Sequence, residues 1–130
     1  MFCMGDMNDI MNANEKLGPG RPDLRRINAF CDYVKQCGFI DFGYSSSAYT
    51  WTNKRFTTEP TFQRLDRCLA NAEWCTAYPW TTVYHLPMLH SDHAPTLTIL
   101  NSTRQQTNKP FCFENWWLME QEYEQVAKNN

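Results

Sequence analysis

The sequence predicts a mixed domain of strands and helices, an α/β (α+β) fold, within residues 1–100. Short apolar or alternating segments recur along these residues, and such segments are typical of β-strands. One stretch instead carries apolar side chains at intervals of three and four, which is the pattern of a helix. The hydrophobic content of 42% is enough to build a core and argues against a disordered chain.

The expected strands share a short pattern bounded by turn residues such as glycine and proline. The pattern is present from the first residues, MFCMGD, which read as a buried strand, so we expect the neighbouring strands to lie upstream of this sequence. The segment PTLTIL alternates Thr with Leu or Ile, as a half-buried strand does. The expected strands are residues 1–6, 39–43, 49–53, 63–70, 82–88 and 95–100.

Two helices are expected between these strands. Asp23 is placed to cap the first, whose apolar stripe runs to Val34, and Gly38 is placed to end it. Asn71 is placed to cap a second, shorter helix, which must stop near Pro79. Both helices are therefore marked at each end by residues with a known local role.

The domain organisation follows from a change of composition near residue 100. Residues 1–100 form the predicted domain, and residues 101–109 are polar and linker-like. The segment FCFENWWLMEQEYEQV then carries a helical pattern rich in aromatic side chains. We expect residues 101–130 to be a linker followed by an amphipathic helix.

Charge and cysteine content bound the setting of the chain. The net charge of −2 gives no global basic field, which counts mildly against a freestanding DNA-binding domain. The six cysteines form no C-x-x-C pair and no signal peptide is visible, so an intracellular, reducing setting is expected. A zinc site is conceivable, although its spacing fits no common template. That site would use Cys68, Cys75, His85 and His90. Basic residues cluster locally in two places: the first cluster is Arg21, Arg25 and Arg26, and the second is Lys54, Arg55, Arg64 and Arg67.

Polar side chains stand at the ends of several expected strands: Asp6 with Asn8, Asp66, and Asp92 with His93. Such side chains converge if their strands are neighbours in one sheet. Buried or crowded carboxylates must be paired, hydrated or bound to a metal ion. Oxygen ligands of this kind suit Mg²⁺ or Mn²⁺, and a histidine beside them can donate to a phosphate oxygen.

Each of these residues also has an ordinary structural interpretation. Asp6 and Asn8 alone are common turn residues. Asp66 is unusual in a strand, but Arg64 or Arg67 can supply a plain salt bridge. The aspartate and histidine before the last strand can be surface loop residues, and the aromatic residues of YTWTN are more typical of a core than of a ligand site.

The order of the motifs changes this balance. Over roughly residues 1–100 the chain resembles the C-terminal half of the endonuclease/exonuclease/phosphatase superfamily, because it carries in order the motifs MGDMN, YTWTN, RLDR and SDHAP. YTWTN and RLDRCLAN are most similar to the endonucleases of plant LINE-type (non-LTR) retrotransposons. The tail KPFCFENWWLMEQEYEQV is similar to the segment that joins such an endonuclease to a reverse transcriptase domain. The implied fold is the C-terminal half of a DNase I-like four-layer α/β/β/α sandwich with mixed β-sheets.

The resemblance also implies a role for each matched residue. Asp6 orients or deprotonates the attacking water, and Asn8 positions the nucleophile and the substrate phosphate. Asp66 hydrogen-bonds the catalytic histidine, which is His93, and His93 contacts the scissile phosphate. Asp92 lies near the metal ion, Mg²⁺ or Mn²⁺. The implied reaction is hydrolysis of DNA phosphodiester bonds.

The same resemblance implies a limit on activity. The principal metal-binding Glu of the superfamily belongs to its first half and cannot be assigned in these 130 residues. We therefore expect little or no nuclease activity from this chain alone. Two alternatives stay open: a non-catalytic remnant or binding module of the same fold, and a superfamily phosphatase or sphingomyelinase acting on another phosphoester. The expected partners are DNA and a reverse transcriptase domain, not a membrane, with a nuclear location if the endonuclease functions.

Overall fold

The computed structural model describes residues 1–56 and 58–100, and within them it confirms an α+β fold. The linker and helix expected in residues 101–130 lie outside the described residues. The helices are η1 (Ala13–Glu15, a 3-10 turn), α1 (Leu24–Gln36) and α2 (Ala72–Ala77). The strands are β1 (Phe2–Asp6), β2 (Lys16–Leu17), β3 (Phe39–Asp41), β4 (Trp51–Thr52), β5 (Phe62–Gln63), β6 (Asp66–Asn71), β7 (Thr82–His85) and β8 (Thr96–Ile99).

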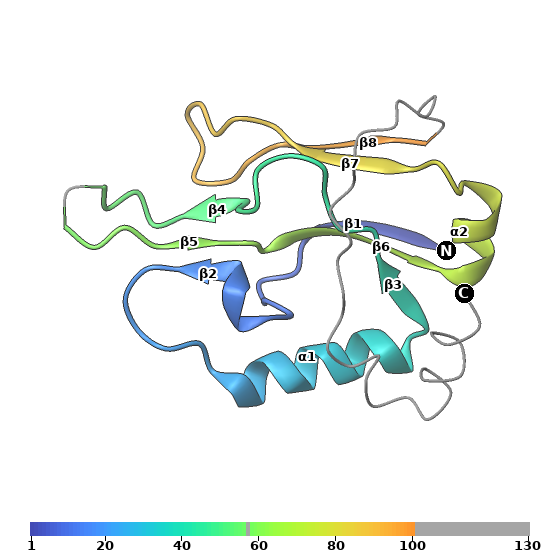
Figure 1. Ribbon diagram of the computed structural model, residues 1–130, viewed down its shortest axis with the longest axis horizontal. Coiled ribbons are helices and arrows are strands. Elements are labelled where there is room, and N and C mark those ends of the chain that lie inside the picture. The colour runs from blue at the N-terminus through green and yellow to red at the C-terminus, as the bar shows by residue number, and fades with distance from the viewer. Residues whose placement is uncertain (57, 101–130) are drawn as a thin grey trace, which may run out of the picture.

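The strands form three small sheets, ordered β1-β6-β3, β2-β5-β4 and β7-β8. In Figure 1, β7 and β8 lie above the long β5–β6 ribbon, and α1 lies below it. All strand pairs among the described residues are antiparallel, whereas the expected sandwich has mixed sheets. The four-layer arrangement is thus a proposal, and the α+β class is what the structure shows.

Strand β6 is the centre of the first sheet and is buried on both faces. Cys68 and Ala70 are fully enclosed on one face, and Arg67 and Leu69 are enclosed on the other. This double burial needs cover on both sides. Sheet β7–β8 contacts the first face through Thr98, whose hydroxyl lies 3.2 Å from the Cys68 sulfur.

The first strand is exposed in the part of the chain that the structure describes, and the covering strands expected upstream of this sequence stay a prediction. Among the described residues β1 pairs with β6 on one side only, so it lies at the edge of this sheet. Cys3 is exposed, and Met4 is 49% exposed. Apolar composition predicts a covered strand, but it does not report which segment covers the strand.

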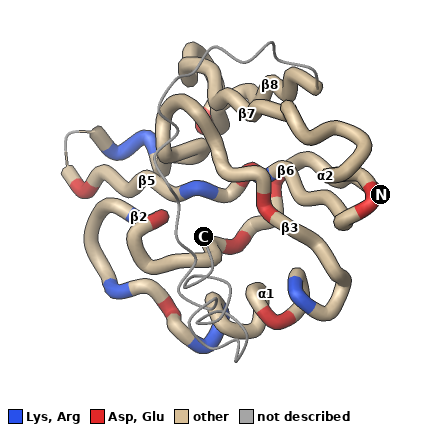
Figure 2. The backbone as a smooth tube through the Cα atoms, turned by 45° about the vertical axis from the view of Figure 1, so that its right-hand side comes forward, with Lys and Arg blue, Asp and Glu red and all other residues tan. Residues whose placement is uncertain are grey.

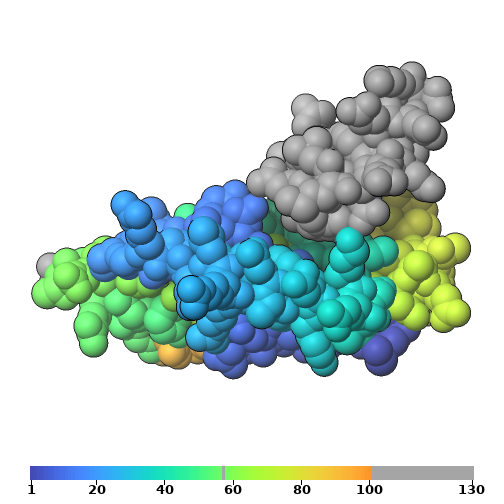
Figure 3. Space-filling view, turned by 90° about the horizontal axis from the view of Figure 1, so that it is seen from below, coloured from blue at the N-terminus to red at the C-terminus, as the bar shows by residue number. Residues whose placement is uncertain are grey.

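Helix α1 begins and ends where its capping residues predict. The Asp23 carboxylate accepts a hydrogen bond of 2.9 Å from the Arg25 N–H, one of the donors left unpaired at a helix start. Gly38 adopts a φ of +65°, the left-handed conformation that glycine favours just beyond a helix. Ile27 and Val34 are buried, and Figure 3 shows α1 covering the lower face of the molecule.

The later elements also follow their local signals. The Asn71 side chain accepts from the Trp74 N–H at the start of α2, and β7 ends before Pro87. β8 is half-buried as expected, but its threonines face inward while Leu97 is exposed. No helix within residues 1–56 and 58–100 has both the length and the apolar character needed to cross a membrane.

The strand expected over residues 63–70 is interrupted. β5 ends at Gln63 and β6 begins at Asp66, so the two residues between them leave the ladder. The Leu65 and Asp66 N–H groups both donate to the Thr50 hydroxyl oxygen at 2.9 Å. A side chain from another segment therefore replaces a strand partner at this point, which no local sequence pattern predicts.

Candidate active site

The candidate site forms where β1 ends and β6 begins. In the antiparallel register of these strands, Asp6 is paired directly with Asp66. The Asp66 side chain is only 13% exposed, whereas the Asp6 side chain is 32% exposed. Two carboxylates that are far apart in the sequence thus lie side by side at one end of a sheet, as the motif order predicted.

His93 reaches these carboxylates from the loop between β7 and β8. Its Nδ1 lies 2.9 Å from an Asp66 carboxylate oxygen, although the two residues are 27 positions apart. Its Nε2 lies 3.9 Å from an Asp6 carboxylate oxygen, which is too far for a hydrogen bond. The bond to Asp66 fixes the orientation of the imidazole and leaves Nε2 directed towards the side of Asp6.

The electrostatics of this group favour a protonated histidine. Partial burial opposes the charge, but the hydrogen bond to Asp66 and the negative charges of Asp66, Asp6 and Asp92 together raise the pKa of His93 above its ordinary value. A larger fraction of the imidazole is therefore cationic near neutral pH. A cationic imidazole at this position can donate to an anionic oxygen of a substrate.

Asn8 is held close to Asp6 by its own backbone. It adopts a φ of +55°, unusual for a residue with a side chain, and its N–H donates to an Asp6 carboxylate oxygen at 2.8 Å. The Arg26 guanidinium donates to the Asn8 carbonyl oxygen at 2.7 Å. The segment after β1 is thereby turned sharply, with the Asn8 side chain exposed beside the candidate site.

Asp92 lies in the same loop as His93, and its neighbours come from β4 and the residue Lys54 just after it. A hydrogen bond from its own N–H lowers the pKa of its carboxyl; the Trp51 indole and the positive charge of Lys54 act in the same direction. Its carbonyl oxygen accepts from the Thr52 N–H at 3.0 Å, which ties the loop to β4. Asp92 is thus held next to β4 by its backbone, and its role as a metal ligand stays a prediction.

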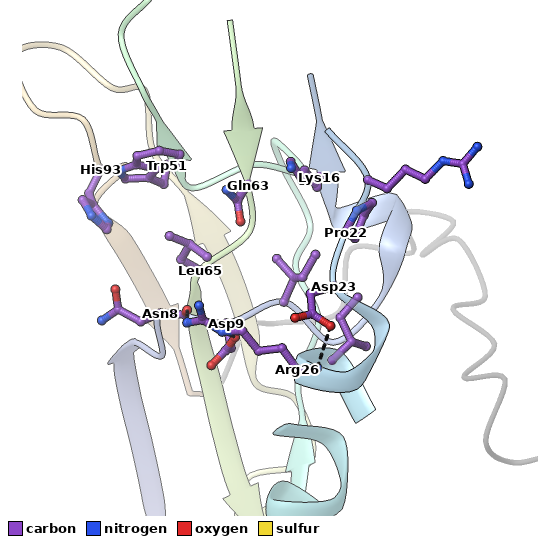
Figure 4. Close-up of a pocket in the computed structure, with 13 residues that line it drawn as sticks. Asn8, Asp9, Lys16, Pro22, Asp23, Arg26, Trp51, Gln63, Leu65 and His93 are labelled. Carbon is purple, nitrogen blue, oxygen red and sulfur yellow. Dashed lines mark hydrogen bonds and ion pairs between the residues drawn. The ribbon is translucent and has the colours of Figure 1, made fainter. Parts of the chain in front are cut away.

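A pocket of about 500 Å³ opens beside His93. Figure 4 shows Trp51 next to His93 at one side of the pocket, with Leu65 and Gln63 further in. Part of its wall comes from the buried apolar cluster that includes Leu65 and Ile10. Trp51 is half-buried and packs against this cluster, as expected for an aromatic residue of YTWTN, and it also lines the pocket. The fully buried members of the segment are its two threonines.

Arg64 and Arg67, which belong to a local basic cluster in the sequence, are not on the surface of the molecule, and they do not pair with Asp66. Both are buried, and each makes ion pairs with Glu15 and with Asp41. Figure 2 shows acidic positions on β3 and next to β2, and basic positions along the β5–β6 stretch. Asp66 is therefore left for His93, and the salt-bridge interpretation of Asp66 is wrong. We call these four residues the buried ion-pair cluster.

The residues around Asp6 and His93, which we call the rim of the candidate site, can be compared with metal sites by the type of ligand atom that they offer. Asp6, Asn8 and Asp92 offer the hard oxygen atoms that Mg²⁺ and Mn²⁺ prefer. In the part of the chain that the structure describes, no group of three or more acidic, histidine or cysteine side chains is placed to hold a metal ion. The rim residues therefore fit a hard cation by ligand type, but further ligands would be needed.

The zinc alternative finds no support among the same residues. His85 is buried, and its Nδ1 lies 2.7 Å from the Ser47 carbonyl oxygen. Cys68 is enclosed beside Thr98. Both side chains serve the interior of the domain.

Three features of the site escaped the sequence reasoning. The hydrogen bonds of Thr50, the place of Trp51 in the pocket, and the ion pairs that Glu15 and Asp41 make with the two buried arginines all depend on contacts between segments remote in sequence. The one available signal for Glu15 was its position three residues after Asn12, which forms a capping box at η1.

Comparisons with protein-family models, curated proteins and solved structures give no match for this chain.

Proposed function

We propose that this chain is part of a divalent-metal-dependent phosphodiesterase that nicks DNA, most similar to the endonucleases of plant LINE-type retrotransposons. The observation that carries the proposal is the convergence of Asp6, Asp66 and His93. These residues come from three separate motifs, yet His93 lies 2.9 Å from Asp66 and 3.9 Å from Asp6. A chance resemblance of short motifs gives no reason for them to meet.

Each residue has a role consistent with its surroundings. Asp66 holds the imidazole of His93 through Nδ1, so that Nε2 can donate to an oxygen of the scissile phosphate. Asp6 is exposed enough to orient or deprotonate an attacking water molecule. Asn8, turned towards the rim by its backbone, positions the water and the phosphate.

The metal ion proposed for this reaction is Mg²⁺ or Mn²⁺, with Asp92 as the ligand from this chain. When bound, such an ion neutralises phosphate charge and makes a coordinated water more acidic. The principal ligand of the superfamily, a Glu, cannot be assigned among these 130 residues. We propose that the 130 residues alone have little or no activity for that reason.

The pocket beside His93 supports a nucleic-acid substrate over a small phosphoester. Trp51 supplies an aromatic surface on which a sugar or base can pack, and Leu65 supplies apolar wall. A location in the nucleus and a reverse transcriptase domain as a neighbour in the full-length protein belong to the same proposal.

The test is Mg²⁺-dependent nicking of supercoiled plasmid. The 130-residue chain and a chimera are assayed, the chimera carrying the first half of a plant LINE-type endonuclease before Met1. We expect nicking by the chimera only, and a loss of about 100-fold or more on His93→Ala, the usual contribution of a general acid. Asp32→Asn, which changes an exposed carboxylate on α1, is the matched control and should nick normally.

Two results would contradict the proposal. A chimera that folds, as judged by circular dichroism, but nicks as well with His93→Ala as without it would remove the catalytic role of His93. Strong nicking by the 130-residue chain alone would show that the metal site needs no ligand from outside this sequence.

A further inference from the structure

Thr50 is fully buried between the candidate active site and the core, and none of the motif-derived roles includes it. It directly precedes β4. Its hydroxyl oxygen accepts hydrogen bonds from the Leu65 and Asp66 N–H groups, both at 2.9 Å. The Thr50 side chain is therefore hydrogen-bonded to the backbone of Asp66, the residue whose carboxylate contacts the His93 imidazole.

The backbone of Thr50 contacts the other half of the pair. Its carbonyl oxygen accepts from the Ala94 N–H at 2.7 Å, the amide directly after His93. The neighbouring residue Trp51 forms an isolated antiparallel bridge with His93. Thr50 is thus hydrogen-bonded on one side to Asp66 and on the other to the loop that carries His93.

The chain at Asp66 depends on this contact because it has left the β-ladder. The residues between β5 and β6 have no strand partner on the side of Thr50, and the threonine hydroxyl takes that place. Leu65 is itself buried, so its N–H needs a partner from the protein. Without the hydroxyl, these donors would have to find partners by shifting the backbone at Asp66.

We propose that Thr50 is the positioning residue of the candidate active site, holding Asp66 and His93 at hydrogen-bond distance from each other. Its catalytic meaning rests on the proposed function, whereas the geometric role concerns the Asp66–His93 pair itself. The substitution Thr50→Val has nearly the same shape but offers no acceptor. Thr50→Ser keeps the acceptor and loses only a methyl group.

The test reads the tautomer of His93 by ¹⁵N NMR, at a fixed pH where the imidazole is neutral. In the wild-type chain the bond to Asp66 should hold the proton on Nδ1. We expect Thr50→Val to reduce the ratio of Nδ1–H to Nε2–H tautomers by about tenfold, because a hydrogen bond to a charged acceptor is lost or lengthened. Thr50→Ser should keep the wild-type ratio.

Thr52→Val is the matched control. Thr52 is also a buried threonine of the same segment, but its hydroxyl accepts from the Lys54 N–H, at 3.2 Å, on a part of the chain away from Asp66. The tautomer ratio of His93 in Thr52→Val should equal that of the wild type. An unchanged ratio in folded Thr50→Val, or an equal change in Thr52→Val, would overturn the proposal.

A second measurement decides the matter if Thr50→Val does not fold. In the wild-type chain, the Leu65 and Asp66 amide protons should be protected from hydrogen exchange as strongly as those of β6. Fast exchange of these two amides would overturn the proposal. Neither measurement needs catalysis, so a failure here is separate from a failure of the proposed function, which the nicking assay decides.

Discussion

Replacement of Arg67 by methionine tests the buried ion-pair cluster. Arg67 is fully enclosed; its guanidinium lies 2.6 Å from an Asp41 oxygen, pairs with Glu15 and stands over the ring of Phe30. Methionine keeps the apolar stem but removes the charge. Breaking a buried ion pair from one side typically costs about 3–5 kcal/mol, because a carboxylate is left uncompensated. Arg64 still contacts both carboxylates, so we expect the lower end, about 3 kcal/mol.

The assay is urea unfolding followed by Trp fluorescence. For an m-value of about 1–3 kcal/mol/M, a loss of about 3 kcal/mol lowers the midpoint by about 1–3 M. Arg26→Met is the matched control, because the Arg26 side chain is 62% exposed in its pair with Asp9. Its midpoint should stay within error of the wild type. Equal shifts in the two variants would refute the argument from burial.

A double variant separates lost attraction from uncompensated charge. The two Asp41 oxygens have different partners: one accepts from Gly43 and Arg64, and the other faces Arg67. In Arg67→Met/Asp41→Asn, the new amide nitrogen can take the place of the oxygen that has lost its partner. We expect the double variant to be more stable than the sum of the single changes predicts, by about 1–3 kcal/mol. Additive effects would show that the two residues are not coupled.

Three further predictions concern pH and local backbone. Burial, aided by the charge of Arg64, lowers the pKa of His85. The contribution of His85 to stability should therefore be full above its unfolded pKa of about 6.5 and should be lost as the pH falls towards the lowered pKa of the folded state. His85→Gln should reduce the difference in stability between pH 7 and pH 5, as measured by unfolding curves at the two pH values. Gly18→Ala should cost about 1–3 kcal/mol in urea unfolding, because Gly18 has a φ of +126° and a Cβ there would lie 2.5 Å from the Pro60 carbonyl oxygen; an unchanged midpoint would contradict this contact. Asp23→Ala should cost about 0.5–2 kcal/mol by removing the cap of α1, with a matching loss of helical circular dichroism, and a wild-type unfolding curve would show that the cap is dispensable.

The candidate site was predicted in part. Asp6, Asp66 and His93 were chosen from motif order, and the structure brings them together. The surroundings of Asp92 were not foreseen, since the orientation of an exposed carboxylate depends on neighbours such as Trp51 that lie on another strand. The partners of Arg64 were likewise hidden, because one of them is 49 positions away.

The sequence by itself determined the elements whose cause is local. Asp23 and Gly38 bound α1, and Asn71 begins α2, because a cap acts on amide and carbonyl groups within a few residues of itself. Tertiary structure alone decided that β1 pairs with β6 and that the ladder is interrupted between β5 and β6 at the hydroxyl of Thr50. These outcomes depend on which remote segment supplies a hydrogen-bond partner or a covering side chain, and a pattern of neighbouring residues carries no information about that choice.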